Sequence, residues 1–197
     1  MSKTLSELQA RISALEDEFE RELAARRSQF KYIVENRRVK FEAEARRHHR
    51  RLRTGLLRFL RRSPIMHYVT APVIYSLALP IVLLDIFVSV YQWVCFPVYG
   101  IRKVKRSNYI ALDRRNLSYL NLIEKLNCEF CGYANGVIAY VREVASRTEQ
   151  YWCPIKHSRR VSSCHHRYYN FIDYGDADGF RTRAEKLREN VRNEGDS

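Results

Sequence analysis

Hydrophobic and polar positions divide the 197-residue chain into four stretches. Residues 1–62 are highly charged with apolar residues at regular intervals, and residues 63–101 are almost entirely apolar. Residues 102–171 combine helical apolar patterns with cysteines and histidines, whereas residues 172–197 are polar. This order predicts an all-α protein with a coiled-coil arm, a membrane segment, a small helical Cys/His domain and a polar tail.

The first stretch predicts one long helix. Thr4 and Glu7 fit a capping box, and no proline occurs before Pro64. A helix of roughly 58 residues would be about 87 Å long, too long for the rest of the chain to cover. Its apolar residues settle into an eleven-residue period, which forms one stripe on a nearly straight helix. We therefore expect a coiled coil that joins copies of this chain, with the number of copies left open. The stripe has two rows, Leu8, Phe19, Phe30, Phe41 and Leu52, and Ile12, Leu23, Val34, Ala45 and Leu56.

The apolar stretch is a candidate bilayer segment, because His67 to Ile101 contains a single formal charge, Asp85. As one helix these residues would extend about 52 Å, well beyond a hydrocarbon core of about 30 Å. Pro80 offers a break, so we prefer a helical hairpin or re-entrant pair to a single span. Asp85 then either begins the second helix or is a functional intramembrane carboxylate, and we favour the first.

The net charge of +13 is concentrated beside the apolar stretch. Basic residues that flank membrane segments stay cytoplasmic and bind anionic lipid headgroups. We therefore expect an integral protein of an inner membrane, with its bulk on the cytoplasmic side. We prefer this lipid surface to a nucleic-acid surface, because the charge follows the edges of the apolar stretch. The predicted membrane-surface residues are Arg46, Arg47, Arg50, Arg51, Arg53, Arg58, Arg61, Arg62, Arg102, Lys103, Lys105 and Arg106.

Cysteines and histidines in the third stretch have the spacing of a structural metal site. Cys128 and Cys131 are followed by a glycine, which predicts a turn between a helix that starts at Asp113 and another over residues 134–149. With Cys153 and His157 they would complete a zinc site. Cys164 is the alternative fourth ligand and His165 a weaker one. An iron–sulfur cluster uses the same thiolates, and free thiols in a helical core are the third interpretation.

Two motifs carry a resemblance to a known family. They are the run from Tyr91 through Cys95-Phe-Pro-Val-Tyr-Gly, and Cys-Glu-Phe-Cys-Gly-Tyr-Ala-Asn-Gly followed by Arg-Thr-Glu-Gln-Tyr-Trp-Cys-Pro-Ile-Lys-His. Over residues 65–171 the chain resembles a family of uncharacterised bacterial membrane proteins. The resemblance implies a membrane location and a bacterial source. It implies no activity and no functional residues.

These motifs predict anchoring and assembly. We therefore expect a non-enzymatic membrane scaffold that oligomerises through its coil and presents a zinc-stabilised cytoplasmic domain to a protein partner. A membrane-bound iron or iron–sulfur redox or metal-handling protein is the alternative, and a tethered nucleic-acid binder is the third hypothesis. The sequence leaves open whether the protein is an enzyme. We favour a protein that is not an enzyme, because no Ser/His/Asp spacing, phosphate-binding glycine loop or HExxH motif occurs.

Overall fold

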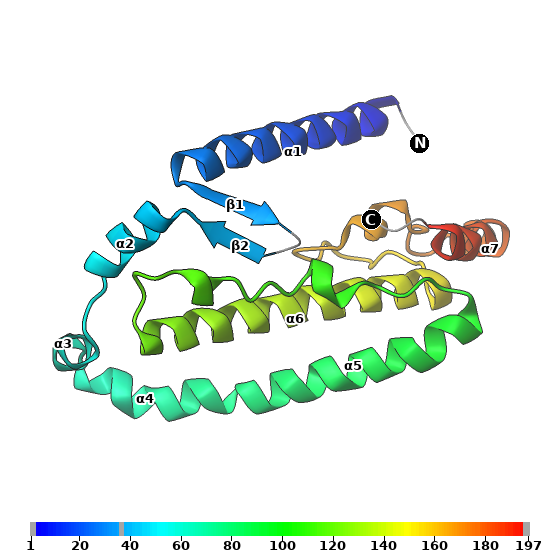
Figure 1. Ribbon diagram of the computed structural model, residues 1–197. Coiled ribbons are helices and arrows are strands. Elements are labelled where there is room, and N and C mark those ends of the chain that lie inside the picture. The colour runs from blue at the N-terminus through cyan, green and yellow to red at the C-terminus, as the bar shows by residue number, and fades with distance from the viewer. Residues whose placement is uncertain (1–2, 36–37, 195–197) are drawn as a thin grey trace. The chain divides into compact units, whose positions relative to one another are not determined.

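The computed structural model describes residues 3–35 and 38–194, and it is 71% helical and 5% strand. The predicted all-α class is confirmed, with one small β-hairpin added. The chain divides into two compact units, unit 1 with residues 1–62 and 113–127, and unit 2 with residues 63–112 and 128–197. The elements (Figure 1) are α1 (Lys3–Gln29), β1 (Tyr32–Glu35), β2 (Arg38–Phe41), α2 (Ala43–Arg51), α3 (Leu56–Arg62), α4 (Ile65–Ser76), α5 (Ala78–Tyr99), α6 (Leu122–Trp152) and α7 (Ala177–Asn193), with short 3₁₀ turns at Arg106–Asn108, Arg114–Asn116 and His166–Asn170.

Unit 1 begins with α1 and the β-hairpin, so the prediction of one continuous helix through residue 62 is wrong. α1 ends before Lys31, whose positive φ of 54° turns the chain into β1. β1 and β2 then pair antiparallel, with Tyr32 opposite Phe41 and Val34 opposite Val39. Aromatic and β-branched residues favour this extended pairing, and here that preference outweighs the helical period.

The apolar stretch forms two helices in succession, α4 and α5, separated by Leu77. Pro80 lies in the first turn of α5, where its missing N–H costs no helical hydrogen bond, so proline starts this helix without reversing the chain. The preferred hairpin is therefore not formed. Asp85 lies seven residues after Ala78 inside α5, so the prediction that it begins a helix is also wrong.

α6 is one helix where two were predicted. It begins at Leu122, nine residues after the expected start at Asp113, and it continues without a break through Cys131 and Gly132. Four residues on, Gly136 allows a close backbone contact, because a Cβ atom there would lie 2.7 Å from the carbonyl oxygen of Tyr109. The missing side chain of Gly136 therefore lets α6 pack closely against the backbone at Tyr109 and Ile110.

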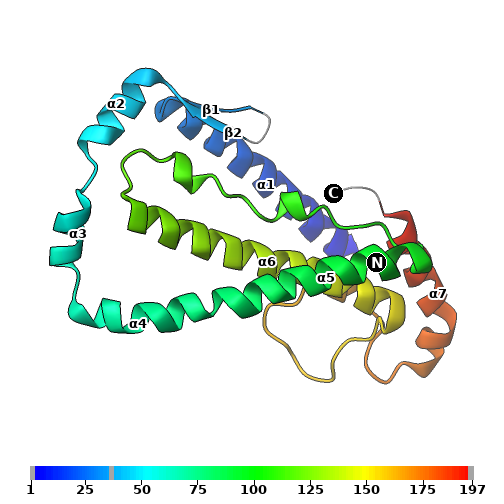
Figure 2. The same ribbon diagram turned by 60° about the horizontal axis from the view of Figure 1, so that its bottom comes forward.

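In unit 2, α5 and α6 run side by side in the same direction (Figure 1, Figure 2). Residues 101–112, here called the return segment, lead back along α6: Arg102 lies against Arg147, and Ile110 lies against Gly136. The core between these elements, joined by one residue of α7, consists of buried side chains. They are Phe96, Ile101, Val104, Tyr140, Val144 and, from α7, Val191.

α7 belongs to this core, although residues 172–197 were predicted to be a polar tail. Asp176 caps the helix by accepting a hydrogen bond from the Gly179 N–H at 2.8 Å. Ala184, Leu187 and Val191 are buried on one face of α7. Most of this stretch is therefore a packed helix and not a polar tail, because three apolar residues at helical spacing form a buried face.

Candidate functional site

The most exposed apolar surface of the protein lies on α4 and α5. Within the described residues, Ile65–Tyr99 is the one helical run long and apolar enough to cross a membrane, and almost none of it is buried. Exposed large apolar surfaces of this size are typical of membrane or partner contacts. The membrane prediction is thus supported by length and composition. The exposed large apolar residues of α5 are Leu79, Val82, Leu83, Leu84, Ile86, Phe87, Val90, Trp93, Val94 and Val98.

One face of α5 differs, because it is polar and covered. Asp85, Ser89, Gln92 and Phe96 follow one another at intervals of four, three and four residues, so they share one side of the helix. Asp85, Gln92 and Phe96 are buried, and Ser89 is half-buried. We call these four residues the polar stripe. Its spacing is visible in the sequence and predicts that this side of an apolar helix packs against protein.

Asp85 is neutralised by the return segment. Arg106 donates from Nε to Oδ1 at 2.9 Å and from Nη2 to Oδ2 at 2.6 Å, a bidentate ion pair. Tyr133 of α6 donates its hydroxyl to Oδ2 at 2.8 Å. The hydrogen bond to Asp85 raises the pKa of Arg106 above its ordinary value. The carboxylate is therefore held as a charged structural contact among three elements.

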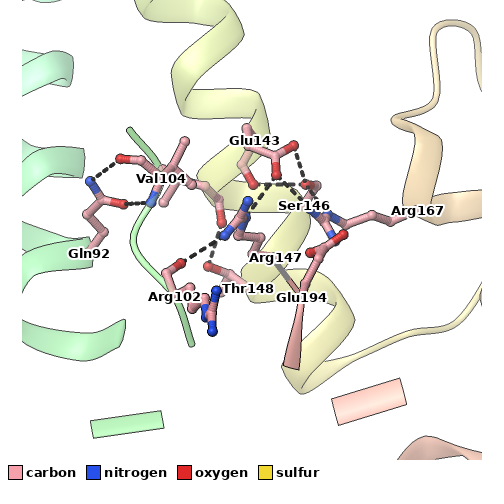
Figure 3. A network of polar contacts seen from close by, with 10 residues as sticks. Gln92, Arg102, Val104, Glu143, Ser146, Arg147, Thr148, Arg167 and Glu194 are labelled. Carbon is pink, nitrogen blue, oxygen red and sulfur yellow. Dashed lines mark hydrogen bonds and ion pairs between the residues drawn. The ribbon is translucent and has the colours of Figure 1, made fainter. Parts of the chain in front are cut away.

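Gln92 fixes the backbone of the return segment. Its Nε2 donates to the Val104 carbonyl at 3.2 Å, and its Oε1 accepts from the Val104 N–H at 2.9 Å (Figure 3). The same Nε2 contacts the Tyr140 hydroxyl at 2.6 Å. The amide of Gln92 therefore hydrogen-bonds to both the backbone N–H and the backbone carbonyl of Val104, as a neighbouring β-strand would. Because both groups are bonded, Val104 can be buried without an unsatisfied backbone donor or acceptor.

A second polar cluster surrounds Glu143 on α6 (Figure 3). Its Oε1 accepts from Arg147 Nε at 2.8 Å and from Arg167 Nη2 at 2.6 Å. Arg147 also donates to the Arg102 carbonyl at 2.9 Å, and Arg167 pairs with Glu194 beyond α7. Burial raises the pKa of Glu143, but the bonds from Arg147 and Arg167 outweigh it, so the net pKa is below the ordinary value. The cluster joins α6, the return segment and the carboxyl end of the described chain.

The predicted metal ligands are not brought together. Cys128 and Cys131 lie inside α6, whereas Cys153 follows its last residue. At 1.5 Å per residue, the 22 residues from Cys131 to Cys153 correspond to about 33 Å, far beyond the span of one metal site. The ring of His157 stacks on Tyr168, and the Cys164 thiol donates to the Val161 carbonyl at 3.2 Å.

The remaining histidine of that prediction is also engaged, since His165 Nε2 lies 2.9 Å from a Glu149 carboxylate oxygen. No group of three or more His, Cys, Asp or Glu side chains in residues 3–35 and 38–194 could hold a metal ion. The helix through Gly132 is the reason, because it replaces the turn that the CxxC spacing predicted. The binding of zinc, iron or an iron–sulfur cluster therefore stays a prediction from the sequence.

The predicted lipid-binding basic residues are all exposed. Eight are arginines of unit 1 between residues 46 and 62, and four lie in the return segment. In the second group, Arg106 pairs with Asp85, and the Lys103 ammonium lies 5.9 Å from the centre of the Trp93 ring. Arg106 was predicted to bind lipid headgroups, and its pairing with Asp85 was not predicted.

A shallow apolar groove of about 460 Å³ runs between α5 and α6. Val88 and Tyr91 line one side, Val141 and Val144 the other, and Trp152 lies at the end. The Tyr91 hydroxyl is 3.0 Å from the Thr148 hydroxyl, so its polar end is already paired. The groove therefore offers apolar contact surface and no cluster of acid and base groups.

Comparison of the chain with protein-family models, with curated proteins and with solved structures gives no match.

Proposed function

We propose that the protein is a non-enzymatic membrane scaffold. Its apolar helices anchor it in the bilayer, and the helical part of unit 2 is available to a protein partner. The observation that carries this proposal is the division of α5 into two kinds of surface. The polar stripe is bonded to the protein's own chain, whereas apolar side chains such as Phe87 and Val94 have no cover within the described structure.

The paired charges of unit 2 support a structural role. Asp85 and Glu143 both bind arginines from other segments. A general base or nucleophile needs a protonation state that can change and a path to substrate, and these carboxylates are instead acceptors in ion pairs. Their contacts hold the return segment and α7 in place.

The amino-terminal helix supports assembly of several copies. Ile12, Leu15 and Phe19 follow at intervals of three and four residues, and each is more than half exposed. These are the spacings that form a coiled-coil seam. We propose that α1, and not a 58-residue helix, forms this contact between copies. Leu15→Asp with Phe19→Asp is expected to convert the oligomer to a monomer in analytical ultracentrifugation, whereas Glu16→Gln and Glu20→Gln leave it assembled.

The membrane assignment is tested by alkaline extraction. Expressed protein is expected in the membrane pellet after carbonate treatment and in solution only after detergent is added. Release by carbonate alone would contradict a membrane-embedded helix. As a matched pair, Phe87→Asn with Val94→Asn should weaken retention. The same change at two exposed apolar residues of α1, Ile12 and Leu15, should leave it unchanged.

Anionic lipid is the proposed partner of the exposed arginines. Each basic residue near an anionic surface contributes about 1 kcal/mol at moderate salt. Neutralising Arg46, Arg50 and Arg53 together should therefore weaken binding to vesicles that contain phosphatidylglycerol by roughly two orders of magnitude. Binding to neutral phosphatidylcholine should change little. Equal loss on both vesicles would show that the arginines act through folding.

A further inference from the structure

We infer that α4 and α5 lie in the plane of one leaflet, with both ends on the same side, and do not cross the bilayer. This inference rests on the proposed membrane anchoring and adds its geometry. Four observations carry it: the composition of unit 1, the path of the return segment, the exposure of its charges, and the two faces of α5.

Unit 1 contains chain from both sides of the apolar stretch. Residues 1–62 precede α4, residues 113–127 follow the return segment, and the two form one compact body. The ring of His49 in α2 lies 5.2 Å from the ring of Tyr119, almost perpendicular to it. A helix that crossed the membrane once between these segments would place them on opposite sides.

The return segment accompanies α5 back along its length. It meets α5 at Gln92 through Val104 and at Asp85 through Arg106. Asp85 precedes Tyr99 by 14 residues, so this contact lies about 21 Å back from the end of α5. If the carboxyl half of α5 crossed the hydrocarbon core, the return segment would enter the core with it.

The composition of the return segment excludes that environment. Except for one 3₁₀ turn, its described backbone has no regular secondary structure, and irregular backbone is not tolerated where it faces lipid. Arg102, Lys103, Lys105 and Arg106 are all exposed. Charged side chains facing hydrocarbon are costly. α5 beside this segment must therefore lie outside the core or at its surface.

A bilayer crossing by residues 65–84 alone is also inconsistent with the structure. These residues could span about 30 Å, but residues 1–62 and 113–127, which form one compact body, would then lie on opposite sides of the bilayer. The exposed face of Phe87, Val94 and Val98 would also remain in water. An in-plane helix avoids both difficulties, because this face enters the leaflet while the polar stripe and α6 lie on the water side.

The charges at the two ends agree with this arrangement. Arg61 and Arg62 precede α4, and Arg102 and Lys103 follow α5. A basic end at each side of an apolar helix places both ends at the same anionic surface. The occupant of the exposed apolar face is therefore the outer part of one lipid leaflet, to a depth of about 5–10 Å.

Depth measurements along one face of the helix test the inference. Val69 of α4 and Phe87 and Val98 of α5 are exposed and are 18 and 11 residues apart. Because only Leu77 separates the two helices, this helical spacing places the three residues near one side of the run Ile65–Tyr99. Each is replaced by tryptophan in turn, in a Trp93→Phe, Trp152→Phe background that removes both native tryptophans. Fluorescence is then quenched by phosphatidylcholines brominated at different acyl positions, in vesicles that also contain phosphatidylglycerol.

An in-plane helix gives the same depth at all three positions, so one bromine position quenches all of them most strongly. A spanning helix centred near residue 82 places Phe87 about 8 Å from the bilayer centre, but Val69 about 20 Å and Val98 about 24 Å. A depth that changes in this way along the helix would overturn the inference. Circular dichroism and vesicle flotation of the background variant confirm that it is folded and bound.

Protease sidedness gives a second, independent readout. Full-length protein with epitope tags at both ends is added to preformed sealed vesicles, which are floated and treated with external proteinase K. Removal of both tags agrees with the in-plane arrangement, and protection of one tag overturns it. Failure of the protein to float at all would instead refute the proposed membrane anchoring, so the two proposals are tested separately.

Discussion

Replacing Glu143 with glutamine removes one negative charge from between two buried guanidinium groups. The Glu143 side chain is 9% exposed, and those of Arg147 and Arg167 are each 5% exposed, so solvent screens these charges little. Removing one partner of a buried ion pair destabilises proteins by about 3–5 kcal/mol. Arg167 keeps its contact with Glu194, so we expect a loss near the lower end, about 3 kcal/mol.

The assay is urea unfolding in non-ionic detergent micelles, followed by fluorescence of the two tryptophans, both in unit 2. The midpoint should fall while the slope with urea stays the same, because the surface exposed on unfolding is unchanged. Glu185→Gln is the matched control. It is the same substitution in α7, where Arg188 lies 2.9 Å from a glutamate side chain that is 61% exposed.

Exposed ion pairs of that kind contribute about 0–1 kcal/mol. A Glu143→Gln protein that loses no more stability than Glu185→Gln would contradict this expectation. It would mean that the cluster around Glu143 does not hold the described elements together.

Other contacts in unit 2 give three further expected outcomes. Tyr140→Phe should lower the unfolding free energy by about 1–2 kcal/mol in the same urea assay, because the hydrogen bonds of its hydroxyl with Gln92 and Ser89 are lost and packing is kept. Gly136→Ala should lower the thermal midpoint despite the better helix propensity of alanine, since the new Cβ would lie 2.7 Å from the Tyr109 carbonyl oxygen; an unchanged or raised midpoint would contradict this contact. The folded pKa of Glu143 is lowered, so the unfolded state binds more protons, and stability should fall as the pH drops below about 4.3 through the folded pKa. Glu143→Gln should show a smaller fall over this pH range in acid titrations of the urea midpoint.

The sequence predicted the exposed apolar helices and much of the helix content, since a long apolar run with a single charge is typical of helices that contact lipid. It did not predict the β-hairpin. Val34 and Phe41 belong to the eleven-residue helical period and are also compatible with the alternating pattern of a strand. Hydrophobic periodicity alone therefore does not distinguish a helix from a strand here. Aromatic and β-branched residues in the two strands favoured the extended pairing; they are Tyr32, Ile33, Val34, Val39 and Phe41.

The metal-site prediction depended on glycine as a breaker. Gly132 follows the CxxC pair and suggested a turn, but a single glycine costs a helix only about 1 kcal/mol, less than the packing of a long buried face stabilises. The partner of Asp85 was equally hard to predict. Arg106 follows it by 21 residues, and only the path of the return segment brings them together.

The parallel arrangement of α5 and α6 has a consequence for the order of folding. The groups that neutralise and cover the polar stripe of α5 follow it in the chain: Arg106 follows Asp85 by 21 residues, Tyr133 by 48, and Tyr140 follows Gln92 by 48. Contacts that close longer loops cost more conformational entropy, so they are slower to form. Asp85 can therefore pair with Arg106 before α6 is in place, whereas the hydroxyls of Tyr133 and Tyr140 complete the cover of the stripe only once α6 lies beside α5.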